Sequence, residues 1–185
     1  GNQQSTASVA ENANELTKSI IDLTTKLGCE KVNIIAHSKG GLDCRYAMEH
    51  CGLAPYVASL TTVNSPHRGC KFVDYLLNKA PKKFTNKVAK TYNKAYMKLG
   101  DKSPDFLHGV SDLTSLRCSR ADKEMKQPPG VYCQSVGSRQ VRGRSGQFPL
   151  NLTYHLVNLF DGDNDGIVGC DSFEWGEKYT FVKTK

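Results

Sequence analysis

The stretch from Lys31 to Leu42 constrains the fold more than any other part of the chain. Lys31 to Ala36 is a short run rich in β-branched residues, which predicts a buried strand. The run breaks at residues 37–41, whose sequence is His-Ser-Lys-Gly-Gly, and a helical pattern then runs from Leu42 to about His50. A strand that leads directly into a helix is the building unit of a parallel α/β sheet.

Other segments repeat this alternation of helix and strand. Ser8 and Glu11 form a capping box at the start of an amphipathic helix, and Gly28 is suited to end it. An apolar stripe predicts one buried face of this helix: Val9, Ala13, Leu16, Ile20, Leu23 and Leu27. Further strand candidates are residues 57–63, 131–136 and 179–182. We therefore predict an α/β fold with a mostly parallel sheet and flanking helices.

The interval from residue 78 to residue 130 has no clear strand pattern and predicts a helical insertion between two strands. Apolar and aromatic residues recur in it at helical spacing: Phe84, Val88, Tyr92, Ala95, Tyr96 and Leu99. Lysines fall mostly between them, so the pattern predicts a helix with an aromatic face and a basic face. We expect one domain over residues 1–185, with residues 78–130 as a cap or lid. Packing on the core and movement as a lid are both open.

The chain has a formal net charge of +7, and much of this excess lies in one stretch of the insertion. Seven lysines lie close together: Lys79, Lys82, Lys83, Lys87, Lys90, Lys94 and Lys98. A basic surface favours anionic partners, so an anionic lipid interface is one expectation and a solvated helix face is the alternative. We expect no nucleic-acid partner. No apolar run approaches the roughly 20 residues that span a bilayer, so we expect no transmembrane segment.

The seven cysteines follow no spacing typical of a metal site. They are too sparse for a disulfide scaffold. Cys118 and Cys133 could pair across a loop, but small buried thiols are the preferred interpretation. We expect neither a bound metal nor a cofactor.

Ser38 stands at the junction of the predicted strand and helix, where a serine in a tight turn projects its Oγ above the C-terminal edge of the sheet. Its neighbours must be small, and Ala36, Gly40 and Gly41 satisfy this requirement. The backbone N–H of Lys39, at a helix N-terminus, would point at a developing oxyanion. This arrangement predicts a nucleophilic serine, and the alternative is a tight turn without a catalytic role.

Three segments resemble bacterial triacylglycerol lipases of the α/β-hydrolase superfamily, in the order in which those enzymes carry them. Residues 32–46 resemble the nucleophile elbow, residues 57–69 the strand and following TPHRG turn, and residues 162–168 the loop with the catalytic acid. The resemblance implies a serine carboxylic-ester hydrolase that acts on lipid or acyl esters through an acyl-enzyme. It assigns Ser38 as nucleophile and Asp165 as acid. It also favours secretion, with a cytoplasmic location left open.

The chain departs from the family pattern at three places. Ala36 replaces the first glycine of the elbow, and Ser65 stands where threonine is commoner. The family's catalytic histidine follows the acid loop, whereas all five histidines here precede Asp165: His37, His50, His67, His108 and His155. His37 and His67 fall near the expected active-site edge, and we interpret them as packing and turn residues. We expect a fragment that is incomplete at both ends and inactive alone.

Other functions remain open on the same residues. A thioesterase, an acyltransferase or an amidase would use the same elbow, and a hydrolase-like binding module would have lost its triad. Asp161, Asp163 and Asp165, with Gly166, also match the start of a calcium loop of the EF-hand type. Ser172 stands where that loop requires a bidentate glutamate.

Overall fold

A four-stranded sheet organises the fold, and every neighbouring pair of its strands is parallel. The computed structural model describes residues 4, 6–98, 100–143 and 150–183. In sheet order the strands are β1 (Val32–His37), β2 (Val57–Val63), β3 (Tyr132–Ser138) and β4 (Lys178–Val182). The predicted parallel sheet is confirmed, with strand ends within two residues of the predicted ones.

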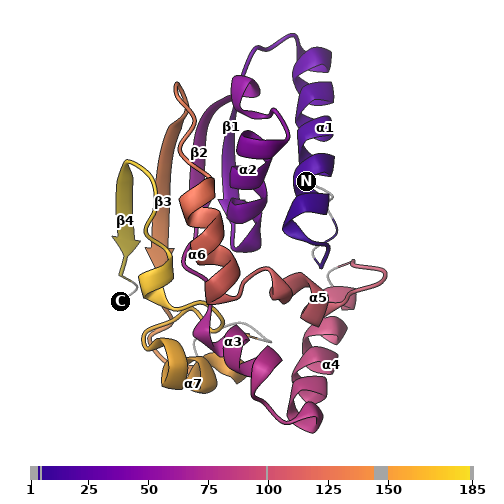
Figure 1. The fold of residues 1–185 in the computed structure, drawn as a ribbon, viewed down its shortest axis with the longest axis vertical. Helices are drawn as coiled ribbons and strands as arrows, with labels where there is room; N and C mark the ends of the chain where they lie inside the picture. The colour runs from indigo at the N-terminus through magenta and orange to yellow at the C-terminus, as the bar shows by residue number, and fades with distance from the viewer. Residues whose placement is uncertain (1–3, 5, 99, 144–149, 184–185) are drawn as a thin grey trace.

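Helices cover one face of this sheet and also lie beyond one end of its strands. They are α1 (Val9–Leu27), α2 (Lys39–His50), α3 (Lys71–Asn78), α4 (Lys82–Lys98), α5 (Phe106–Ser111), α6 (Ser115–Glu124) and α7 (Leu150–Asp161). In Figure 1, α1, α2 and α6 lie in front of the sheet, whereas α3, α4 and α7 gather beyond the ends toward which the strand arrows point. The patterns in the sequence predicted neither α3 nor α7.

The predicted capping box begins α1 as expected. Ser8 Oγ accepts from the backbone N–H of Glu11 at 3.2 Å, and the backbone N–H of Ser8 donates to Glu11 Oε2 at 2.9 Å. Gly28 ends the helix in the left-handed conformation, with φ of 65°. The box satisfies two N–H groups that have no acceptor within the helix.

The apolar stripe predicted along α1 is wrong in its second half. Leu23 and Leu27 are 45% and 64% exposed, and the buried face passes through Thr17 and Thr24 instead. The expected stripe repeats every 3.5 residues, so it drifts away from the buried side of a straight helix. The two threonine hydroxyls donate to backbone carbonyls within α1, and these bonds lower the free-energy cost of burying the hydroxyl groups.

β1 is an edge strand that is buried on one face only, contrary to the prediction of a buried strand. Ala36 packs in a core cluster with residues of α1 and α2, and Ile34 packs against that cluster. On the opposite face Asn33 and His37 are exposed, and Ile35 is 79% exposed. Alternate side chains of a strand point to opposite faces, so a strand packed through one face buries every second residue.

The aromatic face of α4 packs in the second core cluster, with residues of α3, α5 and α7. Val88, Tyr92 and Ala95 are buried, and the Tyr92 ring stacks on Phe106 with ring centroids 4.4 Å apart. Leu99, the last residue of the predicted stripe, lies outside the described residues. All seven lysines of the basic face are exposed, as the two-faced pattern predicted.

All seven cysteines are free thiols, so the pairing considered for Cys118 and Cys133 is not formed. Both are buried, as are Cys44 and Cys70. Burial raises the pKa of the Cys44 and Cys118 thiols to about 12. None of the helices in the described part of the chain is long and apolar enough to cross a membrane.

Candidate active site

Ser38 occupies a strained turn between the end of β1 and the start of α2. Its φ of 53° and ψ of −131° lie outside the conformations that side-chain-bearing residues prefer. The turn is held by two backbone hydrogen bonds: Ser38 N–H donates to Val63 O at 2.9 Å, and Gly41 N–H donates to Ser38 O at 3.1 Å. The Ser38 side chain makes no capping bond to α2. Strain of this kind is typical of functional turns.

The close approach beneath this turn occurs at Gly41 rather than at Gly40. A Cβ added at Gly41 would lie 2.8 Å from Ser65 Cβ and 3.0 Å from Thr62 Cγ2. Thr62 belongs to β2, and Ser65 follows two residues after its end. A Cβ added at Gly40 would meet only Ala36 Cβ, at an ordinary 3.9 Å. The absence of a side chain at Gly41 therefore allows α2 to pack directly on the sheet.

The side-chain ammonium and the backbone N–H of Lys39 have different surroundings. Its Nζ donates to Asp43 Oδ1 at 2.9 Å, and Asn12 Nδ2 donates to Asp43 Oδ2 at 3.1 Å. Burial raises the pKa of the Asp43 carboxyl, and the Lys39 ammonium partly opposes this shift. As the first residue of α2, Lys39 has a backbone N–H with no acceptor inside the helix. The side chain is held by Asp43, so only the N–H is left beside Ser38.

Asp165 lies in the loop after α7, with both carboxylate oxygens accepting hydrogen bonds. Oδ1 accepts from the N–H groups of Ile167 at 3.1 Å and Val168 at 2.9 Å. Oδ2 accepts from Asn64 Nδ2 at 3.1 Å. Burial raises the pKa of this carboxyl, and the three donors oppose the shift. The carboxylate is thus fixed in one orientation inside the protein.

Asn64 is a polar neighbour of this carboxylate that the sequence patterns did not identify. It is 7% exposed and has a φ of 48°. Its Nδ2 also donates to Ser138 Oγ at 3.0 Å, and its Oδ1 accepts from the Ser138 N–H at 2.8 Å. A usable signal existed, because asparagine directly after a strand tolerates left-handed backbone better than most residues.

These bonds place Ser38 and Asp165 at the same edge of the sheet. Ser38 bonds to Val63, the last residue of β2, and Asn64 follows directly and bonds to Asp165. The C-terminal ends of β1, β2 and β3 meet here, because the sheet is parallel. The C-terminal edge of a parallel sheet is where α/β folds place their binding sites.

The two histidines expected near this edge occupy different surroundings. His37 is exposed beside Ser38, and a positive charge on it would lower the pKa of Asp165. His67 is 1% exposed, with Nδ1 3.0 Å from Arg45 Nη1 and Nε2 3.0 Å from Thr62 Oγ1. Arginine can only donate, so Nδ1 accepts and Nε2–H donates to the threonine. Burial lowers the pKa of His67, which keeps it neutral.

The carboxylates of the calcium-loop pattern have separate partners. Asp161 accepts from the first N–H groups of α3, those of Lys71 at 3.0 Å and Phe72 at 2.9 Å, and Asp163 pairs with Arg139. Asp165 is held as described above. Within the described ranges no three His, Cys, Asp or Glu side chains are grouped so that they could hold a metal ion.

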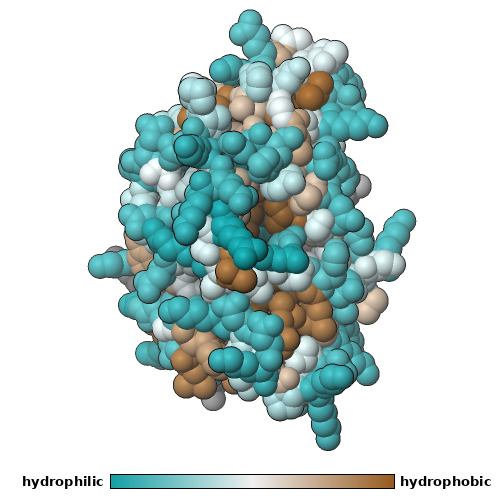
Figure 2. Space-filling view, viewed as in Figure 1, coloured by the Kyte–Doolittle hydropathy of each residue, from teal (hydrophilic) through white to brown (hydrophobic). Residues whose placement is uncertain are grey.

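An apolar hollow of about 210 Å³ lies beside the first turns of α2. Val9 of α1, Leu42 and Tyr46 of α2, and Ala121 and Met125 at the end of α6 are among the residues that line it. The space-filling view shows brown side chains in this region between α1, α2 and α6, within a largely hydrophilic surface (Figure 2). Leu42 is one helical turn from Ser38.

Two solved structures are similar to nearly the whole chain. A mature Bacillus licheniformis lipase is 18% identical with a TM-score of 0.70, over 96% of this chain and 66% of that one. A metagenomic carboxyl esterase is 18% identical with a TM-score of 0.72, over 96% of this chain and 50% of that one. Likeness at this identity shows the fold, which is that of the α/β-hydrolases.

Sequence comparison finds short matches to triacylglycerol lipases. Triacylglycerol lipase 2 of Saccharomyces cerevisiae is 40% identical over 65 residues, which are 35% of this chain and 20% of the yeast protein. A triacylglycerol lipase of Pseudarthrobacter phenanthrenivorans is 50% identical over 50 residues, 26% of this chain and 15% of that protein. The chain therefore matches a fifth or less of the length of these relatives, and the resemblance to lipases is confirmed.

The chain belongs to the palmitoyl protein thioesterase family, whose model matches residues 1–104. This range holds α1, β1, the Ser38 turn, β2 and α4. The acid loop lies beyond it.

Proposed function

We propose that this chain carries the nucleophile and the acid of a serine hydrolase that cleaves lipid or acyl esters through an acyl-enzyme. The observation that carries the proposal is the strained Ser38 turn at the sheet edge that also holds the hydrogen-bonded, partly buried Asp165 carboxylate. Similarity to lipases and esterases supports the same chemistry.

In the first half-reaction Ser38 Oγ attacks the ester carbonyl while a histidine takes the hydroxyl proton. The oxyanion that forms is stabilised by the backbone N–H of Lys39 at the start of α2. Collapse of this intermediate breaks the bond to the leaving alcohol, which receives the proton from the histidine. Ser38 is left acylated, and water then repeats the steps and releases the carboxylic acid.

Asp165 has the role of orienting and stabilising the imidazolium during these steps. None of the described contacts joins a histidine of this chain to Ser38 or Asp165 by a hydrogen bond. We propose that the base is a histidine outside residues 1–185, as the resemblance to lipases implies. From the resemblance to lipases we also propose that residues 78–130 form a cap within one domain that spans residues 1–185.

A second candidate is thioester hydrolysis, because the family that matches residues 1–104 is described as palmitoyl protein thioesterase. The acyl-serine intermediate is the same, and only the leaving group changes from an alcohol to a thiol. A palmitoyl thioester is therefore the substrate to compare with an oxygen ester.

Covalent labelling of the full-length protein with a fluorophosphonate probe tests the nucleophile. We expect one label per chain on Ser38 and no label on Ser38→Ala, since a fluorophosphonate reacts with an activated serine. Turnover of p-nitrophenyl esters and of palmitoyl-CoA by the same preparation then separates esterase from thioesterase. A folded wild-type protein that neither takes the label nor turns over either substrate would support a binding module instead.

A further inference from the structure

The whole net charge of the chain resides on one face of α4 and the residues just before it. Seven lysines lie between Asp74 and Asp101, an interval without any acidic residue or arginine. The rest of the chain carries eighteen basic and eighteen acidic residues and is formally neutral. We refer to Lys79, Lys82, Lys83, Lys87, Lys90, Lys94 and Lys98 as the lysine face.

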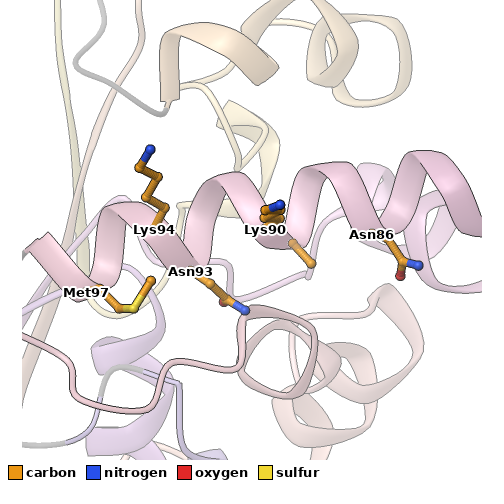
Figure 3. A pocket seen from close by; sticks show the side chains of 6 residues that line it. Asn86, Lys90, Asn93, Lys94 and Met97 are labelled. Carbon is orange, nitrogen blue, oxygen red and sulfur yellow. The ribbon is translucent and has the colours of Figure 1, made fainter.

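The lysine face is a continuous stripe because its central members are spaced by four, three and four residues. Lys83, Lys87, Lys90 and Lys94 therefore line one side of α4, opposite the buried Val88–Tyr92–Ala95 side. Figure 3 shows Lys94 projecting on the side of the helix opposite to Asn93. All seven lysines are exposed, and within the part of the chain that is described no ion pair involves any of them.

Two hydrogen bonds link this helix to the acid loop. Tyr92 Oη lies 2.6 Å from Thr153 Oγ1, and Thr153 Oγ1 donates to the carbonyl of Gly166 at 2.5 Å. Gly166 directly follows Asp165. The buried side of α4 is thus linked through α7 to the acid loop. Figure 1 shows α4 beyond the C-terminal ends of the strands, which is the end of the sheet that holds the candidate active site.

We propose that the lysine face binds an anionic lipid surface and so orients the Ser38 edge of the protein toward the membrane. A surface of anionic lipid attracts clustered basic residues that lie near the bilayer. A hollow of about 480 Å³ runs along the same helix and is lined by Lys90, Lys94 and the half-exposed Met97, among others. It offers cationic and apolar groups side by side to a lipid headgroup.

The composition of this face favours lipid over nucleic acid. The aromatic residues of α4 are buried or half-buried in the core, so they do not form an open platform for stacking bases. The interval between Asp74 and Asp101 contains no arginine. Arginine is the residue whose planar guanidinium forms paired hydrogen bonds with phosphates and base edges. Lysine alone provides point charges, which suit attraction by a diffuse surface potential. Membrane binding by the lysine face does not depend on the proposed function. Only its consequence rests on that function, namely that the ester substrate is taken from the membrane.

Sedimentation with vesicles tests the binding without any catalysis. We expect the chain to bind phosphatidylcholine vesicles that contain 30% phosphatidylserine at about 0.1 M salt, and to lose this binding as salt screens the charges. The variant Lys83→Gln/Lys87→Gln/Lys90→Gln/Lys94→Gln should lower the partition coefficient about a hundredfold or more. Glutamine is a good helix former, so circular dichroism should be unchanged.

A matched control variant removes the same charge from exposed positions elsewhere in the chain. It is Lys18→Gln/Lys26→Gln/Lys123→Gln/Lys126→Gln. It should lower binding less than tenfold. Equal losses in the two variants, equal binding to pure phosphatidylcholine, or tighter binding to a DNA duplex at the same salt would each overturn the proposal.

Activity measurements on the full-length protein distinguish a failure of this proposal from a failure of the proposed function. The lysine-face variant should hydrolyse a soluble short-chain ester at the wild-type rate and lose activity only on an ester embedded in the anionic vesicles. Vesicle binding without any ester or thioester turnover would refute the proposed function alone. Turnover that is equal on both forms of substrate, without vesicle binding, would refute the lysine-face proposal alone.

Discussion

At the scale of single residues, Asn64 connects the two halves of the candidate active site. Its amide donates to Asp165 Oδ2, and it directly follows the residue that accepts the Ser38 backbone bond. A donor to a carboxylate favours the charged form, so Asn64 opposes the effect of burial on the Asp165 pKa. We therefore expect Asn64 to position the acid, without itself taking part in proton transfer.

The variant Asn64→Gly tests this role, because glycine keeps the left-handed backbone and removes only the amide. Without the donor the pKa of Asp165 rises, so the acid limb of kcat/KM in the full-length enzyme should move to higher pH. A hydrogen bond to a charged group is worth about 1.5–3 kcal/mol, so kcat should fall about ten- to a hundredfold. Ser138→Ala, which removes a partner of Asn64 only, should have a smaller effect. An unshifted acid limb with full kcat would contradict the assignment.

At the scale of elements, the packing of α2 on β2 is set by the missing side chain at Gly41. An added methyl group meets Ser65 and Thr62 there, and neither has room to move away, since both are almost fully buried. At Gly40 the same methyl group makes ordinary contact. The two glycines are adjacent in one helix, so the intrinsic effect of a glycine-to-alanine change on helix stability is similar at both positions.

Gly41→Ala should therefore be less stable than Gly40→Ala by about 1–3 kcal/mol, the usual cost of overpacking. For a chain of this size the difference corresponds to roughly 2–12 °C in Tm, measured by thermal unfolding of the two variants side by side. Equal melting temperatures would show that α2 can shift away from the sheet.

At the scale of the whole molecule, the cysteines report whether the core is closed. Cys44, Cys70, Cys118 and Cys133 come from both core clusters and are buried as free thiols. Burial raises the pKa of each of them, so both exclusion of reagent and lack of thiolate slow their reaction.

A thiol reagent such as dithionitrobenzoate should react with all seven cysteines of the unreduced chain in guanidinium, and with at most three in the native chain. The three are Cys29, Cys51 and Cys170, which are partly exposed. A count below seven in denaturant would reveal a disulfide and contradict the structure. Rapid reaction of all seven without denaturant would show that the clusters open.

The sequence alone determined the features that depend on neighbouring residues. The capping box of α1, the strand ends, the Ser38 turn and the two faces of α4 follow from patterns within about twenty residues, because local hydrogen bonds and side-chain periodicity decide them. Tertiary structure decided the rest. The bond from Asn64 to Asp165 spans 101 positions, and the exposure of Ile35 depends on which helices cover β1. No local pattern encodes such contacts, since their energy exists only after distant segments have packed together.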